Sequence, residues 1–367
     1  MPASSLAPWL FAPALLLVLG LALWLWQRRD RHFVSSATVA AAYDRWTADR
    51  LLERLWGDHV HLGYYPRRPQ GSQSPPTTSL ADGALNRAGL RAKAEPAAGV
   101  DFRQAKVDFR QAKVDFVHAL VRWSGLDQLP PGSRVLDVGC GIGGSARILA
   151  RDYGLDVLGI SISPAQIQRA RELTEPGLSC QFAVMDALDL DLADASFTAV
   201  WSVEAGPHMP DKQRYADELL RVLAPGGRLA VADWNRRDPA DRPLDRRERW
   251  VMRQLLDQWA HPEFASIAGF ARNLRSSPYG KGDPDAQGPE LALETGDWTP
   301  ETLPSWIDSI LEGLRRPGQV LSLGPGAVLQ GLRETPTLLL MHWAFATGMM
   351  QFGVFRASKP PATRPGA

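Results

Sequence analysis

The stretch VLDVGCGIGG at residues 135–144 decides the fold of this chain. Its first four residues are mostly apolar, as in a buried strand, and Gly139, Gly141 and Gly144 follow at the G-x-G-x-x-G spacing. Glycines at this spacing let the backbone turn tightly from a strand into a helix and approach a nucleotide. Any strand-to-helix turn can use glycines, so the surrounding sequence has to identify the nucleotide.

Five short β-rich segments alternate with helical segments between residues 133 and 233. This alternation predicts βαβ units, and therefore an α/β fold in which helices cover both faces of a parallel sheet. The apolar run at residues 337–359 predicts a buried helix followed by a final strand, with a membrane contact as the alternative. The five predicted strands are RVLDVG, DVLGIS, CQFAVMD, FTAVWSV and RLAVADW.

Charge and cysteine content exclude several classes of protein. The 367 residues include 41 Lys and Arg against 40 Asp and Glu, so no broad basic field is available to bind nucleic acid. Cys140 and Cys180 are too few for a disulfide framework and lack the spacing of a zinc site. We therefore expect a reducing compartment, no metal ion, no nucleic acid and no protein partner.

Residues 6–26 form an uncharged apolar run that is about long enough to cross a bilayer core of ~30 Å as a helix. No Lys or Arg precedes this run, whereas Arg28, Arg29 and Arg31 follow it. This pattern favours a retained single-pass anchor with the catalytic part on the cytoplasmic side. A removed signal or a peripheral hydrophobic helix is the alternative.

A seven-residue unit is written twice and begun a third time at residues 100–116, VDFRQAKVDFRQAKVDF. The phenylalanines and alanines of the repeat share one face of a predicted helix. A duplication that lengthened this helix is favoured over a coiled coil, for which two copies are too few. The predicted parts of the chain are an anchor (1–32), a lid segment (33–65), a mobile insertion (66–99), a helical lead-in (100–132), a cofactor-binding core (133–234) and a substrate lid with the C-terminal part of the same domain (235–367).

The second predicted strand argues against a nicotinamide cofactor. NAD-binding folds place an acid at the end of this strand, about 20 residues after the glycines, to bind the ribose. Here the strand ends in GISIS, and Asp156 lies at its beginning, the wrong end for a ligand in an open α/β sheet. A membrane-tethered NAD(P)-dependent oxidoreductase is therefore the less favoured interpretation.

The block around the glycines resembles the class I S-adenosylmethionine-dependent methyltransferases. Their first motif carries an acid two residues before the first glycine, where this chain has Asp137. The segment MDA puts Asp186 and Ala187 where that family binds the adenine, and ELLRVLAPGGRLAVADW matches the family's last shared segment. The resemblance implies a Rossmann-like methyltransferase sheet and S-adenosylmethionine as the cofactor, bound by Asp137, Gly139, Gly141, Gly144, Asp186 and Ala187.

Most members of that family hold the ribose with Asp or Glu at the end of the second strand, where this chain has serine. A subset resembling sterol, tocopherol and cyclopropane-fatty-acid methyltransferases has Ser or Thr there with a nearby Gln. The match of Ser161, Ser163 and Gln166 to this subset implies that Ser161 and Gln166 bind the cofactor. A helix N-cap at Ser163 followed by Pro164 is the alternative explanation, and both roles are compatible.

Two further segments, WGDHVHLGYY at 56–65 and VWSVEAGPHMPDK at 200–212, resemble the tocopherol and prenylquinone methyltransferases of photosynthetic organisms. The resemblance covers nearly the whole chain. It implies C-methylation of 2-methyl-6-phytyl- or 2-methyl-6-solanyl-benzoquinol at the thylakoid or plasma membrane of a photosynthetic bacterium. The alternatives are tocopherol O-methylation, methylation of another lipid, and a binding protein without turnover.

A neutral aromatic carbon is a poor nucleophile, so such a reaction calls for a base that removes a phenolic proton. Glu204 and His208 follow the fourth predicted strand, at the carboxyl edge of the sheet. We predict His208 as the base, because imidazole titrates near neutrality, and Glu204 as the residue that orients it or binds the acceptor. Packing and capping roles are the alternative.

Other aromatic and histidine residues are weaker candidates. Asp58, His59 and His61 are a weak signal for a metal site, and a lid with an apolar wall from Tyr43 and Trp56 is favoured. Four tryptophans after the fifth strand are candidates for lining a tunnel for the prenyl chain, although such residues more often form ordinary core. These are Trp250, Trp259, Trp298 and Trp306.

Overall fold

The computed structural model describes residues 20, 33–48, 50–66, 108–280 and 290–361 of the chain. Its centre is a seven-stranded sheet with the order β3-β2-β1-β4-β5-β7-β6. The first five strands are parallel, and β7 is antiparallel to both of its neighbours. The five predicted strands are confirmed as β1 (Arg134–Val138), β2 (Asp156–Ser161), β3 (Cys180–Val184), β4 (Phe197–Val203) and β5 (Leu223–Arg236), which β6 (Ala292–Asp297) and β7 (Met350–Ser358) extend.

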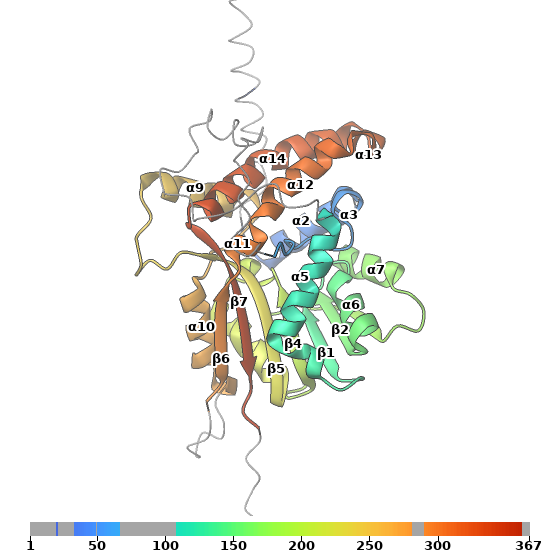
Figure 1. Ribbon diagram of the computed structural model, residues 1–367, viewed down its shortest axis with the longest axis vertical. Coiled ribbons are helices and arrows are strands. Elements are labelled where there is room, and N and C mark those ends of the chain that lie inside the picture. The colour runs from blue at the N-terminus through green and yellow to red at the C-terminus, as the bar shows by residue number, and fades with distance from the viewer. Residues whose placement is uncertain (1–19, 21–32, 49, 67–107, 281–289, 362–367) are drawn as a thin grey trace, which may run out of the picture.

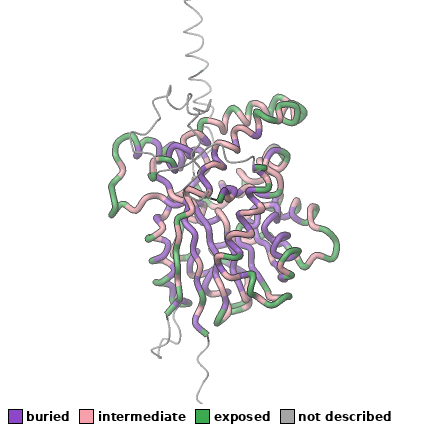
Figure 2. The backbone as a smooth tube through the Cα atoms, in the orientation of Figure 1, coloured by how far each residue is buried: buried purple, intermediate pink, exposed green. Residues whose placement is uncertain are grey.

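Helices cover both faces of this sheet (Figure 1). Side chains alternate along each strand, so Val135 joins a core with α5 and α6 on one face, while Leu136 and Val138 join a second core with α8 and α10 on the other. The predicted arrangement is therefore confirmed, and the central strands of the sheet are among the most deeply buried parts of the molecule (Figure 2). These helices are α5 (Phe109–Ser124), α6 (Gly144–Tyr153), α7 (Pro164–Leu173), α8 (Lys212–Val222) and α10 (Ile267–Ser276).

A helical cap lies over the carboxyl edge of the parallel strands (Figure 1). The N-terminal part of the chain contributes two of its helices, and the part after β5 contributes the others. The predicted helix and strand in the last apolar run are confirmed as α14 and β7. The cap consists of α2 (Ser36–Ala48), α3 (Leu51–Trp56), α9 (Arg246–Gln258), α11 (Thr299–Thr302), α12 (Pro304–Arg315), α13 (Pro317–Ser322) and α14 (Pro325–Ala346).

Several predictions concern residues outside the described ranges. The predicted anchor at 6–26 lies there except for Gly20, and in the described part no helix is both long and apolar enough to cross a membrane. Most of the insertion predicted at 66–99 and the first copy of the heptad also lie outside. The second copy is described from Asp108 on. Its Phe109 and Ala112, with Phe116 of the begun third copy, are buried on one side of α5, as the repeat predicts.

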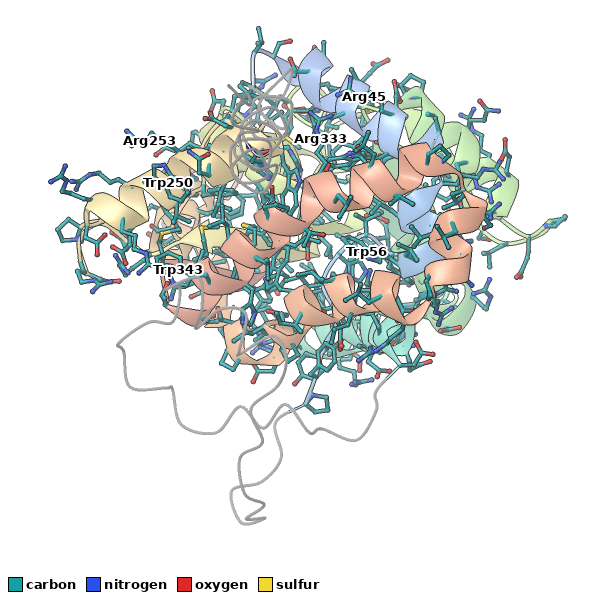
Figure 3. All side chains as sticks on the ribbon, turned by 90° about the horizontal axis from the view of Figure 1, so that it is seen from above. Arg45, Trp56, Trp250, Arg253, Arg333 and Trp343 are labelled. Atoms are coloured by element: carbon teal, nitrogen blue, oxygen red, sulfur yellow. The ribbon has the colours of Figure 1, made fainter. Side chains whose placement is uncertain are left out.

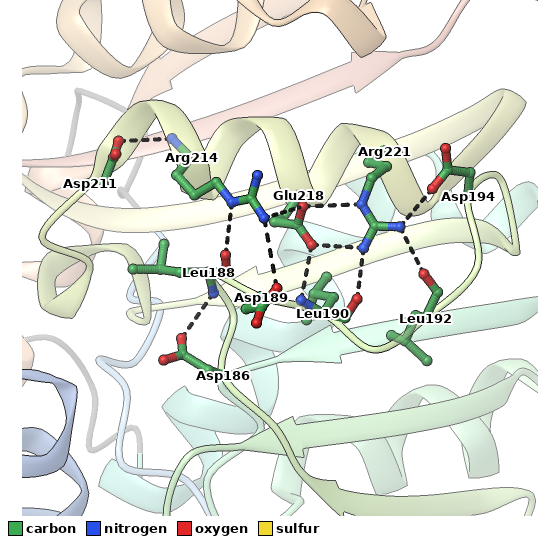
Figure 4. A network of polar contacts seen from close by, with 10 residues as sticks. All are labelled: Asp186, Leu188, Asp189, Leu190, Leu192, Asp194, Asp211, Arg214, Glu218 and Arg221. Carbon is green, nitrogen blue, oxygen red and sulfur yellow. Dashed lines mark hydrogen bonds and ion pairs between the residues drawn. The ribbon is translucent and has the colours of Figure 1, made fainter.

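The loop after β3 is held against α8 by a polar network (Figure 4). The Glu218 carboxylate accepts hydrogen bonds from the backbone N–H of Leu190 at 3.0 Å and from the Arg221 guanidinium at 2.7 Å. Arg221 also donates to the carbonyls of Leu190 and Leu192, and Arg214 donates to that of Leu188. The network thereby fixes the loop that begins at Asp186, one of the predicted cofactor residues.

We expect Glu218→Gln to lower the free energy of unfolding by about 3 kcal/mol, because it removes one partner of a buried ion pair. The side chains of Glu218 and Arg221 are only 3% and 14% exposed, so water cannot replace the lost charge. Denaturant unfolding monitored by circular dichroism measures the change. Asp156→Asn, at a surface pair 4.0 Å from Arg134, is the control and should change stability by less than about 1 kcal/mol.

Candidate active site

A large cavity opens at the carboxyl ends of β1, β2 and β4, beneath the cap. This is the edge of a parallel sheet at which α/β proteins bind their ligands. The fold brings every predicted site residue to the wall of this cavity. They are Asp137, Gly139, Gly141, Gly144, Ser161, Gln166, Asp186, Ala187, Glu204 and His208.

The turn after β1 requires glycine for two physical reasons. Gly139 has φ +77°, a left-handed conformation that other residues rarely adopt, and a Cβ there would lie 2.5 Å from that of Ala205. Gly144 has no such φ, but a Cβ at this position would lie 2.4 Å from the carbonyl oxygen of Asp58 and 2.8 Å from the His59 ring. The glycines thus form a cradle against which other segments of the chain pack directly.

Asp137 is a buried acid at the end of β1, with only 2% of its surface exposed. Its Oδ2 atom has no hydrogen-bond partner within the protein, and burial raises the pKa of its carboxyl to about 7. An unpartnered buried carboxylate beside a glycine cradle suits a cationic group that approaches the backbone closely. The ammonium of S-adenosylmethionine is such a group, so these residues fit the cofactor that the sequence predicts.

Ser161 and Gln166 form a hydrogen-bonded pair beside this cradle. The Ser161 hydroxyl donates to Oε1 of Gln166 at 2.7 Å, which leaves the Gln166 amide nitrogen directed toward the glycine turn. The Ser163 hydroxyl accepts from the Gln166 backbone N–H, so the N-cap interpretation of Ser163 is confirmed. The cap and the pair occur together, which keeps both predicted roles compatible.

The adenine side of the predicted site is formed by the loop after β3. The Asp186 Oδ1 atom accepts from the backbone N–H of Leu188 at 2.9 Å, which fixes the carboxylate at the cavity wall. Ala187 is buried beside it and supplies an apolar surface. The two residues therefore offer one polar and one apolar contact to a ligand.

Residues 57–65, here called the strap, run along the cavity and bind the glycine turn to the neighbouring helices. The Asp58 carboxylate pairs with the Arg147 guanidinium at 2.9 Å. The backbone carbonyl of His59 accepts from the buried Lys113 ammonium at 2.7 Å. Both bonds join the strap to α5 and α6, at the side of the cavity that holds the cradle.

The other half of the strap contacts the catalytic candidates and the cap. The Leu62 backbone N–H donates to Oε1 of Glu204 at 2.7 Å, and the Gly63 N–H donates to the Ser305 hydroxyl on α12 at 2.6 Å. The strap therefore joins the sheet edge to the cap, and it lies within the segment predicted as a lid.

The two histidines of the strap have fixed tautomers. His61 Nδ1 lies 2.8 Å from the Leu62 carbonyl oxygen, which only accepts, so Nδ1 carries the proton. His61 Nε2 then accepts from His59 Nδ1 at 3.0 Å, which leaves a lone pair on His59 Nε2. Burial lowers the pKa of both imidazoles, to about 3 for His61. In the described part of the chain, no group of three His, Cys, Asp or Glu side chains is arranged to hold a metal ion.

We expect Gly144→Ala to weaken cofactor binding roughly tenfold, because the added methyl group collides with the strap at Asp58 and His59. Isothermal titration with S-adenosylmethionine measures the dissociation constant. Gly318→Ala is a control for surface effects, since a Cβ there meets no atom within 4 Å and its backbone is not left-handed. Equal affinities for the Gly144→Ala and unsubstituted proteins would contradict the close approach of the strap.

Both the backbone conformation of Glu204 and the pKa of its carboxyl are unusual. It follows β4 with φ +56°, a strained conformation for a residue with a side chain. Burial raises the pKa of its carboxyl to about 8, even though the Leu62 N–H and the nearby Lys113 favour the charged form. A carboxyl with this pKa exchanges protons close to neutral pH, as a general base does.

His208 does not form the predicted pair with Glu204. Its Nε2 atom lies 2.7 Å from the Tyr43 hydroxyl, and its ring stacks on His261 with centroids 4.3 Å apart. Burial, with Lys212 nearby, lowers the pKa of His208 to about 3, so its imidazole is neutral and weakly basic at neutral pH. These contacts suit a polar wall residue, whereas proton removal near pH 7 suits Glu204.

The loop that carries His208 is held in place by hydrogen bonds with Lys212 and Asp233. The Lys212 ammonium donates to the carbonyls of Gly206 at 2.7 Å and Met209 at 2.6 Å, and the Gly206 N–H donates to the Asp233 carboxylate. Burial raises the pKa of Asp233 and lowers that of Lys212. This short turn therefore has little freedom to move.

Aromatic rings form the wall of the cavity that faces the cap. Trp234 lies 5.2 Å from Trp306 and 5.6 Å from His261 between ring centroids, and Trp259 stacks on Trp306. Of the four tryptophans proposed from the sequence, Trp259 and Trp306 line the cavity. Trp298 instead packs on Trp123, Phe116 and Tyr64, and Trp250 is 45% exposed.

Sequence reasoning missed three residues of the site. Lys113 belongs to the charged part of the heptad, but it follows Phe109 by four residues and therefore lies beside the buried face of α5. This spacing was the available signal. Trp234 ends the segment ELLRVLAPGGRLAVADW, whereas His261 belongs to no motif. The three-dimensional structure places His261 between His208 and Trp234.

The strand order, the glycine cradle and the buried acid define a class I methyltransferase. A family model described as a methyltransferase domain matches residues 136–231. The chain is 48% identical to the 2-methyl-6-phytyl-1,4-hydroquinone methyltransferase of Synechocystis, over 97% of this chain and 99% of that protein. The chain therefore belongs to the S-adenosylmethionine-dependent methyltransferases, in the group that includes the tocopherol methyltransferases.

Other matches are more distant. The tocopherol O-methyltransferase of Arabidopsis thaliana is 29% identical over 84% of this chain and 79% of that protein. The solved geranyl diphosphate C-methyltransferase from Streptomyces coelicolor, a complex with S-adenosyl-L-homocysteine, has a TM-score of 0.56 and 19% identity over 88% of this chain and 96% of that one. The latter likeness shows the fold alone. The predicted enzyme class and cofactor are confirmed.

Proposed function

We propose that this methyltransferase methylates a ring carbon of a prenylated hydroquinone, with 2-methyl-6-phytyl-1,4-hydroquinone as the substrate that its relative's name suggests. The observation that carries the proposal is Glu204, a carboxyl with a pKa raised to about 8 between the glycine cradle and an aromatic wall. A solanyl side chain in place of the phytyl chain fits the same chemistry.

The residues of the site have different roles in the proposed reaction. When bound, the cofactor supplies an electrophilic methyl group on a sulfonium sulfur. Asp137 and the cradle hold its cationic end, and Glu204 accepts the proton of the acceptor hydroxyl that lies next to the reacting carbon. Charge then moves from the phenolic oxygen into the ring. The ring carbon would gain the methyl group as the bond from that methyl to the sulfonium sulfur breaks and leaves a neutral thioether. The proton that this carbon then loses returns to the phenolic oxygen, which restores the aromatic hydroquinone, and the proton held by Glu204 is the one released to solvent.

The aromatic wall and the polar pair have supporting roles. Trp234, Trp259 and Trp306 offer apolar faces to the ring and the start of the prenyl chain, and they exclude water. The neutral Tyr43 and His208 pair offers hydrogen bonds to the second hydroxyl. We also propose that residues 6–26 anchor the enzyme in the thylakoid or plasma membrane, where its lipid acceptor is dissolved.

Product analysis tests the proposed reaction. Membranes that contain the enzyme are incubated with methyl-labelled S-adenosylmethionine and 2-methyl-6-phytyl-1,4-hydroquinone, and the label is located by mass spectrometry and NMR. Label on a ring carbon is expected. Label on oxygen would support the alternative of tocopherol O-methylation, and no transfer to any prenylated quinol would refute the proposal.

A further inference from the structure

The outer side of the cap carries exposed leucines. In the described part of the chain, every leucine that stands out as exposed lies on three consecutive helices: α12, α13 and α14. Leu314 is 71% exposed, Leu321 67%, Leu332 58% and Leu329 47%. A monomeric protein rarely gathers its exposed apolar side chains on one surface without a partner for them. We call this surface, at the end of the molecule that bears α13, the leucine face (Figure 1).

Charged side chains of both signs lie on the helices of the leucine face. Residues 314–333 contain three arginines and no Asp or Glu. Two of the arginines pair with acids of α12, Arg315 with Asp308 and Arg316 with Glu312, so their charge is partly balanced. Helix α9 lies at the other end of α14 from α13 and contains four arginines and two acids, and its Arg253 lies near the exposed Trp250 (Figures 1 and 3). Leucine, tryptophan and arginine together are typical of helices that lie in the interface of an anionic bilayer.

Helix α14 separates the leucine face from the active site by the thickness of one helix. Gln330, Glu334 and Leu338 on one side of α14 line the cavity. Leu329 and Leu332 on the other side are exposed. The Trp259 indole N–H donates to Glu334 at 2.8 Å, which ties this wall to the aromatic residues of the site. A ligand that enters from the surface in contact with the leucine face therefore has to pass only α14 to reach the cavity.

We propose that the leucine face binds the surface of an anionic lipid bilayer and thereby sets the entrance of the cavity against the membrane. The choice of a bilayer rests in part on the proposed prenylated acceptor, which is dissolved there. The four arginines and two acids of α9, at the other end of the same cap, leave that helix net positive, which complements anionic headgroups and opposes a second copy of the chain. Single leucines spaced by glycine and arginine suit shallow insertion between lipids.

Environment-sensitive fluorophores test this surface in the full chain. Leu321→Cys and Leu332→Cys are labelled with a nitrobenzoxadiazole dye, and the labelled unsubstituted chain gives the background from Cys140 and Cys180. The protein is reconstituted with vesicles of equal parts phosphatidylcholine and phosphatidylglycerol. Asp127→Cys is the matched control, because this exposed residue lies just before β1, at the opposite edge of the sheet.

We expect blue-shifted, brighter emission at positions 321 and 332 on these vesicles, quenching by brominated lipid, and no change at 127. The same emission at all three positions would overturn the proposal. A shift without vesicles would show that a second copy or another segment of this chain covers the face, which would also overturn it. This readout needs no turnover, so its failure is separate from failure of the proposed reaction.

A variant with two negative charges introduced into the leucine face measures the consequence for catalysis. Leu321→Asp with Leu332→Asp should lower kcat/KM roughly tenfold for an acceptor in vesicles, since affinity for an interface scales with the apolar area buried there. The same variant should keep its kcat/KM for a short-chain, water-soluble quinol, because neither leucine contacts the cavity. Equal losses with both acceptors would indicate damage to the fold and contradict a membrane role.

Discussion

Glu204→Gln is expected to slow turnover by roughly 10²- to 10⁴-fold, the range for loss of a general base. Gln has nearly the same shape, and its carbonyl oxygen can still accept from the Leu62 N–H, so the strap stays in place. The dissociation constant of S-adenosylmethionine should therefore change little. Single-turnover kinetics with calorimetry separates the two effects.

The proposed role of Glu204 as the base also predicts how kcat/KM changes with pH. A base acts only when ionised, and burial raises the pKa of Glu204 to about 8. The kcat/KM of the unsubstituted enzyme should rise about tenfold per pH unit below pH 8 and level off above it. The Glu204→Gln variant should not show this rise of kcat/KM with pH. If His208 were the base, as predicted from the sequence, His208→Ala would abolish the rise and Glu204→Gln would keep it.

The core of the fold could be predicted because its signals are local. Strands β1, β2, β4 and the second half of β5 are short apolar runs, and their burial on both faces leaves a strong pattern. Strand β6 was not predicted, because its sequence ALETGD is polar and largely exposed at the sheet edge. It is a strand because β7 pairs with it, which is a tertiary cause.

The position of the site residues could be predicted, but their partners could not. Parallel strands end at a common edge, so residues just after β1, β2, β3 and β4 meet whatever the details of the loops. The bond from Tyr43 to His208 spans 165 residues, and the bond from Leu62 to Glu204 spans 142. No periodicity encodes such contacts. They set the burial and therefore the pKa of His208 and Glu204, and this is why we propose Glu204 as the base where the sequence alone favours His208.

Asp137→Asn is expected to change ligand binding and stability in opposite directions. It removes the buried charge that faces the cationic end of the cofactor, which should weaken binding of S-adenosylmethionine roughly 30- to 1000-fold. The affinity of the unsubstituted enzyme should also fall as pH drops below about 7, where Asp137 gains a proton, while that of the variant stays flat. Calorimetry across pH 6 to 8 measures both, roughly one unit either side of that pKa.

Without ligand, the same substitution should stabilise the protein at neutral and higher pH. Burial raises the pKa of Asp137 from 3.8 to about 7, so the folded state binds the proton more tightly than the unfolded state. Stability contributed by this group is therefore present below pH 3.8 and is lost as pH rises through 7. An uncharged Asn avoids this loss, on the order of a few kcal/mol. Denaturant unfolding at pH 8 measures this change. A variant less stable than the unsubstituted protein would contradict an unpaired buried carboxylate at Asp137, because stability falls only when a hydrogen-bonded carboxylate is removed.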